Sequence, residues 1–193
     1  TLYSDYKKGR KPMPTALSDG LVNIKATLAE HDINSFDAQS EADDVIATIA
    51  MKMISNKGEV IIVSTDKGFS QLPTKNLTLW DHFNQQVFDV QQYEKKLGIE
   101  QYQMLDFIAL AGDSGNKIPG IMGIGPKSAA DLLNKFRTLA NLYRSLDNLG
   151  AKQALKLAEG KEIARISYKL AQLQCDIPLN INLKQFRINP ITN

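Results

Sequence analysis

The stretch from Ile118 to Ala130 constrains this chain more than any other, and it reads Ile-Pro-Gly-Ile-Met-Gly-Ile-Gly-Pro-Lys-Ser-Ala-Ala. Glycines and prolines interrupt an otherwise apolar run, which excludes a strand or a continuous helix. Residues 103–111 have one apolar face and end near Gly112, and Pro126 is well placed as the first residue of a second helix. The sequence therefore predicts two helices joined by a tight hairpin.

This hairpin has the features of a phosphate site. Gly123 and Gly125 leave backbone N–H groups uncovered where a helix begins, and Lys127 lies in the first turn of that helix. The alternative is a glycine-rich turn that only packs. The pattern is that of a helix-hairpin-helix motif, which holds DNA phosphates without reading bases.

Composition limits the function classes. The 193 residues suffice for one large domain or two small ones, and a net charge of +2 means that any nucleic-acid surface depends on local clustering. The single cysteine, Cys175, excludes a disulfide framework and a cysteine-based zinc site and suits a reducing compartment. Since no apolar run is long enough to span a membrane and no signal peptide is present, we predict a cytoplasmic protein without a membrane partner.

Three acids open a helical pattern over residues 41–54. Ser40 is the expected N-cap, and the helix dipole explains one or two acids in a first turn. It explains a cluster of Glu41, Asp43 and Asp44 less well, because these charges repel one another. A divalent cation would relieve that repulsion, and carboxylate oxygens suit Mg²⁺ or Mn²⁺.

A second acid site follows the run at residues 58–65. This β-branched run does not alternate, as expected of a strand buried on both faces of a parallel sheet. Asp66 comes next, at the carboxyl end of the strand, where ligands of open α/β sheets collect. A lone Asp there is commonly a turn residue, but an acidic helix start nearby makes Asp66 a metal-site candidate.

The remaining pattern divides the chain in two. A helix with one apolar face is expected at residues 17–31. A hairpin is expected from residues 77–83 and 86–90, then helices at residues 90–97, 139–146 and 162–173. We therefore predict an α/β part at residues 1–99 and a helical, DNA-binding part at residues 100–193.

Three motifs in order make the chain resemble a known family. They are Glu41-Ala42-Asp43-Asp44, Ser64-Thr65-Asp66-Lys67, and Leu110-Ala111-Gly112-Asp113 leading into the hairpin. Together they resemble the flap-endonuclease-like 5′ nuclease family, most closely its free-standing bacterial exonuclease IX type. The resemblance implies a mainly parallel sheet flanked by helices, with a C-terminal helix-hairpin-helix domain. It also implies Mg²⁺-dependent hydrolysis of phosphodiester bonds at single-strand/double-strand junctions of branched, 5′-flap DNA.

The same resemblance assigns roles to single residues. Asp43 matches the main metal-ligand aspartate, Glu41 and Asp44 its neighbours, and Asp66 the acid after the strand. Lys7 and Arg10 match a basic pair that polarises the scissile phosphate. A K⁺ ion is implied in the hairpin, held by the carbonyl oxygens of Leu110, Ala111, Pro119, Ile121 and Ile124. The residues implied to face the DNA are Gly123, Ile124, Gly125, Pro126, Lys127 and Ser128.

The sequence departs from the family pattern in two places. Gly68 and Asn116 stand where two second-site metal ligands are usual, so one strong Mg²⁺ site is expected and the second is degenerate. The two N-terminal strands of the family, each ending in a metal-binding aspartate, are not among these residues. We therefore expect a part of a longer protein that binds branched DNA but cleaves it poorly.

A different class of function stays open. The chain could be a non-catalytic, structure-specific DNA-binding module that uses only the hairpin. Four clustered acids argue against this, because they repel phosphate and a pure binding module does not need them. A ribonuclease of related sheet topology is disfavoured by the hairpin motif. No obligate protein partner is evident.

Overall fold

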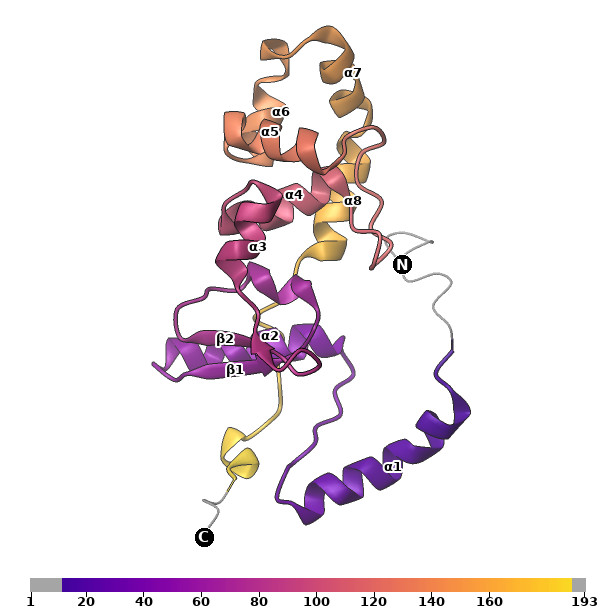
Figure 1. Cartoon of the computed structure of the whole chain (residues 1–193), viewed down its shortest axis with the longest axis vertical. Coiled ribbons are helices and arrows are strands. Elements are labelled where there is room, and N and C mark those ends of the chain that lie inside the picture. Colours follow the sequence, from indigo (N-terminus) through magenta and orange to yellow (C-terminus); the bar gives the residue numbers. More distant parts are fainter. Residues whose placement is uncertain (1–11, 189–193) are drawn as a thin grey trace.

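A small mixed sheet and a group of helices make up the part of the chain that the computed structural model describes, residues 12–188 (Figure 1). The helices and strands are α1 (Thr15–Glu30), α2 (Ala42–Ser55), β1 (Val60–Val63), β2 (Leu77–Asp81), β3 (Gln86–Val87), α3 (Val90–Leu97), α4 (Met104–Ala111), α5 (Pro126–Phe136), α6 (Leu139–Arg144), α7 (Ala151–Glu159) and α8 (Lys161–Ala171). Short 3₁₀ helices connect them: η1 (Lys67–Gln71), η2 (Gln101–Gln103), η3 (Leu146–Asn148) and η4 (Leu183–Phe186). Within the described residues, no helix is both long and apolar enough to cross a membrane.

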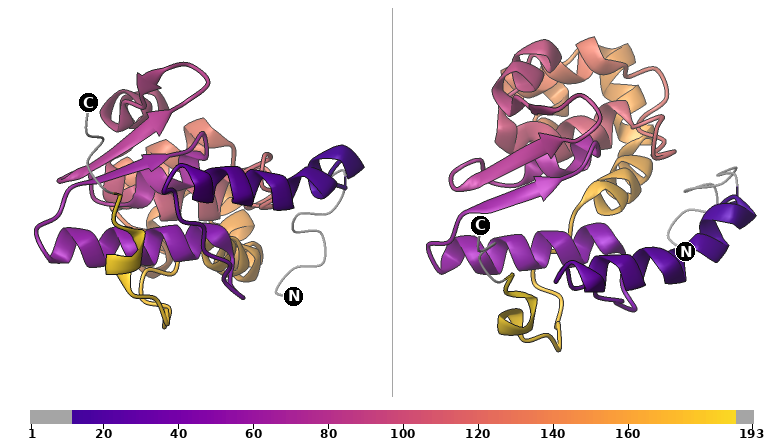
Figure 2. Two further views of the ribbon diagram at one scale, coloured as in Figure 1. Left: turned by 90° about the horizontal axis from the view of Figure 1, so that it is seen from below. Right: turned by 60° about the horizontal axis from the view of Figure 1, so that its bottom comes forward.

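The sheet has the order β1-β2-β3, with β1 parallel to β2 and β2 antiparallel to β3. Ile62 pairs with Leu79, and both are buried against α2, which lies along the sheet (Figure 2). Phe69 and Leu72, from the connection between the parallel strands, complete this first core. The expected combination of parallel strands and flanking helices is thus confirmed, in a sheet that also has an antiparallel edge.

The expectation that β1 is buried on both faces is wrong for the described residues. Successive side chains of a strand point to opposite faces. Ile62 faces the core, whereas Ile61 and Val63 are 69% and 63% exposed on the other face. A run of β-branched residues therefore identified the strand correctly, but the described chain covers only one of its faces.

A second core lies in the helical part. It is built by apolar residues of α4, α5, α6, α7 and α8, and Leu110, Leu133, Leu142 and Leu157 are completely buried in it. Side-chain amides join it to the α/β part at η1. Gln101 Nε2 donates to the carbonyl oxygens of Ser70 (3.1 Å) and Leu72 (2.5 Å). Helices α4 and α5, which flank the predicted hairpin, are held in place by packing in this second core.

The chain beyond α8 returns to the α/β part. The buried Thr48 hydroxyl donates to the Gln174 carbonyl oxygen at 3.2 Å and accepts from the Ile177 N–H at 3.3 Å. Leu173 and Cys175 pack against the first core. Residues 172–177 therefore belong by their contacts to the sheet side, and the division at residues 99 and 100 stays a prediction.

Two helices differ from the sequence expectations in kind. Helix α1, expected at residues 17–31 with one apolar face, has no buried residue, and it stands apart in Figure 1. Helix α7 was not predicted at all, although Gly150 and Gly160 bracket it as N-cap and C-cap. The other helices begin and end within two residues of expectation.

Candidate metal cavity and phosphate-binding hairpin

The predicted acids come together because of the way α2 meets β1. Only residues 56–59 connect them, so the helix and the strand run in opposite directions, and the start of α2 lies at the carboxyl end of β1 (Figure 2). Glu41, and not Ser40 as expected, is the N-cap of α2, and no side chain caps this helix. Its φ of −57° and ψ of 133° are extended, so the helix begins one residue later than the sequence suggested.

All four predicted metal ligands line one cavity of about 270 Å³. Its polar lining residues are Glu41, Asp43, Asp44, Asp66, Asp113, Asn116, Lys169, Gln172 and Gln174. They come from both parts of the chain: the start of α2, the loop after β1, the loop after α4, and α8 with the segment beyond it. The cavity therefore lies where the α/β part and the helical part meet.

Two of the acids also make local hydrogen bonds. The Asp66 carboxylate accepts from the Gly68 N–H at 2.7 Å and caps η1, as the turn-residue alternative expects. Asp44 accepts from the Gln174 N–H at 2.9 Å, which ties residues 172–177 to α2. One oxygen of each carboxylate thus accepts a backbone hydrogen bond. The second oxygen of each carboxylate can act as a cation ligand.

Burial and nearby carboxylates raise the pKa values of two groups close to the cavity, Cys175 and Tyr93. Burial raises the pKa of the Cys175 thiol, and the negative charges of Asp44 and Asp176 raise this pKa further. Burial likewise raises the pKa of Tyr93, and the carboxylate of Asp113 adds to the shift. Both groups therefore stay neutral at neutral pH, and Cys175 has no thiolate with which to act as a nucleophile.

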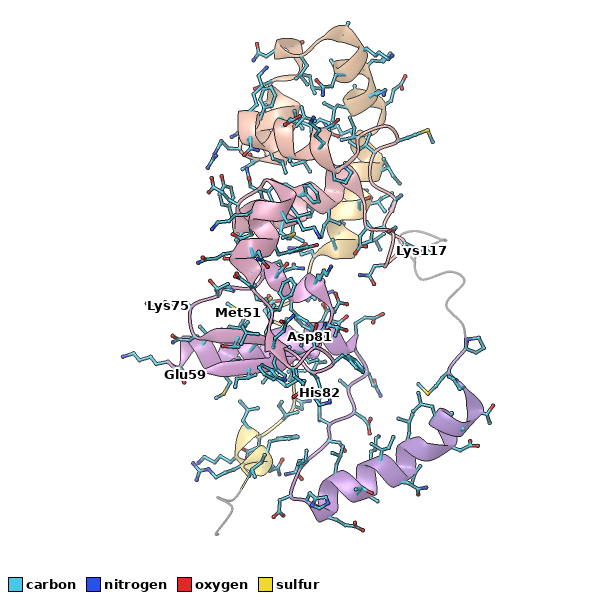
Figure 3. All side chains as sticks on the ribbon, in the orientation of Figure 1. Met51, Glu59, Lys75, Asp81, His82 and Lys117 are labelled. Atoms are coloured by element: carbon cyan, nitrogen blue, oxygen red, sulfur yellow. The ribbon has the colours of Figure 1, made fainter. Side chains whose placement is uncertain are left out.

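The donor atoms suit a hard divalent cation, but they are not yet arranged as a full coordination shell. Within residues 12–188, no three acidic, histidine or cysteine side chains lie close enough to hold a metal ion together. At the predicted degenerate site, Asn116 Nδ2 donates to Asp113 Oδ2 at 3.1 Å. Lys117 follows on the same loop (Figure 3), with a left-handed φ of 58°. The carboxylates fit Mg²⁺ in chemistry, with few ligands on the Asn116 side of the cavity.

The hairpin depends on a close crossing of two backbone segments. A Cβ atom at Gly120 would lie 2.3 Å from the Gly112 nitrogen, and one at Gly112 would lie 2.7 Å from the Pro119 carbonyl oxygen. Both glycines have positive φ, 62° for Gly120 and 76° for Gly112. The Ile121 N–H donates to the Leu110 carbonyl oxygen at 2.8 Å, which closes the crossing.

Four of the five residues whose carbonyls are predicted to bind K⁺ lie at or next to this crossing. Leu110 and Ala111 end α4, and Pro119 and Ile121 belong to the segment that crosses it. Two of these carbonyl oxygens already accept a hydrogen bond, Leu110 from Ile121 and Ile121 from Ile124. Each carbonyl oxygen has a second lone pair that remains available to a cation.

The predicted DNA-facing residues surround the start of α5. Pro126 is the first helical residue and Gly125 the N-cap, with extended backbone and open space around its Cα. Gly123 has a φ of 77°, a left-handed conformation that favours glycine. Lys127 is exposed in the first turn, whereas Ile124 is buried in the core, so only its backbone is placed to face a ligand. The predicted basic pair, Lys7 and Arg10, lies outside the described residues.

Two family models together match the whole chain. Residues 1–98 match the 5′-3′ exonuclease N-terminal resolvase-like domain, and residues 99–193 match the 5′-3′ exonuclease C-terminal SAM fold. The chain belongs to the 5′-3′ exonuclease family.

Curated members of the 5′-3′ exonuclease family are highly similar to it. Flap endonuclease Xni of Shewanella denitrificans is 74% identical over 187 residues, which cover 97% of this chain and 74% of that protein. Flap endonuclease Xni of Shewanella halifaxensis is 66% identical over the same shares of the two chains.

Solved structures share the 5′-3′ exonuclease fold at lower identity. The T5 5′-exonuclease with bound zinc ions has a TM-score of 0.72 and 21% identity, covering 90% of this chain and 69% of that one. The catalytic core of Rad2 in complex with a DNA substrate has a TM-score of 0.51 and 19% identity, covering 80% of this chain and 52% of that one. The chain therefore has the 5′ nuclease fold.

Sequence reasoning on this 5′-3′ exonuclease chain missed parts of both sites. Residues 170–174 form one wall of the cavity, and Lys169 is the only cation among its described lining residues. The sequence of residues 170–174 does not predict that they line the cavity. Their position depends on contacts with α2, which lies far away in the chain. Lys156, which lies over Gly123, was missed with α7. The glycines at both ends of α7 were the available signal.

The crossing predicts contrasting effects of two glycine substitutions. Gly120→Ala adds a methyl group that collides with backbone atoms at a positive φ, so we expect a loss of about 3 kcal/mol or more in the free energy of unfolding. Gly125→Ala meets no atom within 4 Å, and its effect should stay within about 1 kcal/mol. Urea denaturation of both variants measures the difference. Equal stabilities would contradict the close crossing.

Proposed function

We propose that the chain is a structure-specific 5′ flap endonuclease, which hydrolyses phosphodiester bonds at single-strand/double-strand DNA junctions with Mg²⁺. One observation carries the proposal. The loop that supplies Asp113 and Asn116 to the acidic cavity leads within ten residues to the exposed glycines of the hairpin. A cavity suited to a cation and a hairpin suited to DNA phosphates are thus joined by one short segment, and the similarity to Xni flap endonucleases supports the same activity.

The chemistry of the residues assigns metal binding to the acids and DNA binding to the backbone of the hairpin. Asp43, Glu41 and Asp66 would hold Mg²⁺, with Asp44 shared between the ion and residues 172–177. When bound, Mg²⁺ supplies positive charge to the phosphoryl oxygens and lowers the pKa of bound water. The backbone at Gly123 and Gly125 binds the DNA strand and fixes its position.

Further parts of the proposal rest on the sequence. Lys7 and Arg10 would neutralise the charge that develops on the phosphate in the transition state. We also assign the protein to the cytoplasm, where Cys175 stays reduced, without an obligate protein partner.

The second candidate is a DNA-binding module without catalysis. It is favoured by the shortage of ligands on the Asn116 side of the cavity and by the absence, within residues 12–188, of three acids close enough to hold an ion. It does not explain the acids that line the cavity, because their negative charges would repel the DNA phosphates that such a module must bind. A metal-binding measurement separates the two candidates.

Asp43→Asn should abolish Mg²⁺ binding and lower flap cleavage by about a hundredfold or more, because it removes the best-matched ligand. DNA binding should stay the same or become slightly tighter, since a negative charge is lost. Calorimetric titration with Mg²⁺, single-turnover flap cleavage and flap binding measure the three effects. Glu59→Gln is the matched control, because Glu59 is exposed at the opposite end of β1 (Figure 3). Normal cleavage by Asp43→Asn would remove the metal-site assignment.

Gly125→Ala should weaken the binding of flap DNA by about tenfold, because its methyl group shields N–H groups that donate to a phosphate. Gly150→Ala is the control, since Gly150 is also a helix N-cap with open space around its Cα but lies away from the hairpin. Fluorescence anisotropy with a labelled flap substrate compares the variants. If both bind DNA like the unaltered chain, the hairpin is only a packing turn.

K⁺ should strengthen DNA binding at constant ionic strength, because an ion held by the hairpin carbonyls would contact a phosphate directly. The general effect of salt is the opposite, since added cations weaken protein–DNA association. The measurement compares flap affinity in KCl and in choline chloride of the same concentration. Equal affinities in the two salts would rule out the K⁺ site.

A further inference from the structure

The side chain of Lys156 lies over Gly123, an exposed glycine of the hairpin. A Cβ atom at Gly123 would lie 2.8 Å from the Lys156 ammonium nitrogen, 3.5 Å from Cε and 3.9 Å from Cδ. The end of the lysine therefore fills the space that glycine leaves open. Met122 and Gly123 are both exposed, so the ammonium group lies at the surface on which the hairpin presents its backbone.

The position of Lys156 is fixed by the packing of α7, which ends beside the loop that precedes α5 (Figure 1). Leu157 is completely buried, and its carbonyl oxygen accepts a hydrogen bond from the Tyr143 hydroxyl at 3.1 Å. A Cβ atom at Gly160 would lie 2.5 Å from Cγ2 of Ile121, so α7 touches the hairpin without a gap. The backbone that carries Lys156 is thus fixed beside the hairpin by the packing of α7.

The charges around this lysine favour an anionic ligand. Lys156 is half-buried and forms no ion pair within residues 12–188. Two residues beyond Gly123 comes the N-cap of α5, where the helix dipole is positive, and Lys127 adds a second cation. Cations near a helix N-terminus are unfavourable on their own, and an anion between them relieves the repulsion.

We propose that Lys156 binds a DNA phosphate. Its ammonium group would contact the same strand whose phosphate binds the backbone at Gly123. This inference rests on the proposed function and extends its DNA-binding surface from α5 to α7. An ammonium group is a point charge that recognises phosphate without regard to base sequence. Lys156 therefore strengthens binding and fixes the register of the duplex on the hairpin, without adding sequence preference.

The test replaces Lys156 with methionine, which keeps most of the side-chain stem over Gly123 and removes the charge. The slope of log affinity against log salt concentration for flap DNA should decrease by about one, because one fewer phosphate is neutralised. Affinity at low salt should fall by about tenfold, equally for flaps of different sequence. Lys156→Arg should restore the slope.

Lys152→Met is the matched control, since Lys152 is exposed in the first turn of the same helix. Its salt slope should equal that of the unaltered chain, and the thermal midpoints of all variants should agree within a few degrees. A slope for Lys156→Met that is unchanged, or equal to that of Lys152→Met, overturns the proposal. A lowered slope that Lys156→Arg does not restore also overturns it, because the effect is then one of packing.

Failure of this inference can be told apart from failure of the proposed function. If the unaltered chain binds flap DNA and Gly125→Ala weakens this binding while Lys156→Met does not, only the role of Lys156 is wrong. If the unaltered chain does not prefer flap DNA over single strands, the proposed function fails, and the role of Lys156 fails with it.

Discussion

The close crossing of Gly112 and Gly120 is the constraint on which both candidate sites depend. The two backbones approach so closely that neither position has room for a side chain. A buried hydrogen bond from the Gly120 N–H to the Ser167 hydroxyl, 3.1 Å long, ties the crossing to α8. The Asp113 and Ile118 backbones pair just beyond it, so the loop between them is pinned at both ends. One crossing therefore directs Asp113 toward the cavity and starts the hairpin that leads to α5.

Local signals in the sequence predicted those elements whose conformation is decided locally. Gly112 ends α4 and Pro126 begins α5, as expected from a residue that adopts positive φ and one that lacks an N–H group. Helix α3 has the predicted bounds, because Asp89 caps its start and Gly98 ends it in a left-handed conformation. The gathering of Glu41, Asp43, Asp44 and Asp66 around one cavity followed from their positions at the ends of adjacent elements.

What the sequence could not provide depends on contacts distant in the chain. The exposure of Ile61 and Val63 depends on which segments cover the sheet, and the apolar composition of the strand does not predict this. Helix α7 is short and has a single buried side chain, Leu157, so its place beside the hairpin depends on contacts that its own sequence does not reveal. The role of residues 172–177 depends on Thr48 and Asp44, which lie more than a hundred residues earlier.

The return of residues 172–177 to α2 also sets an order of assembly. Helices α4 and α5 and the hairpin between them are made before this segment during synthesis. The hairpin can therefore take its shape while the acidic cavity still lacks one wall, and the cavity is enclosed only when the later segment docks on Thr48. Local opening of that segment in the folded protein would reverse the last step alone, so the cavity can open while the hairpin keeps its conformation.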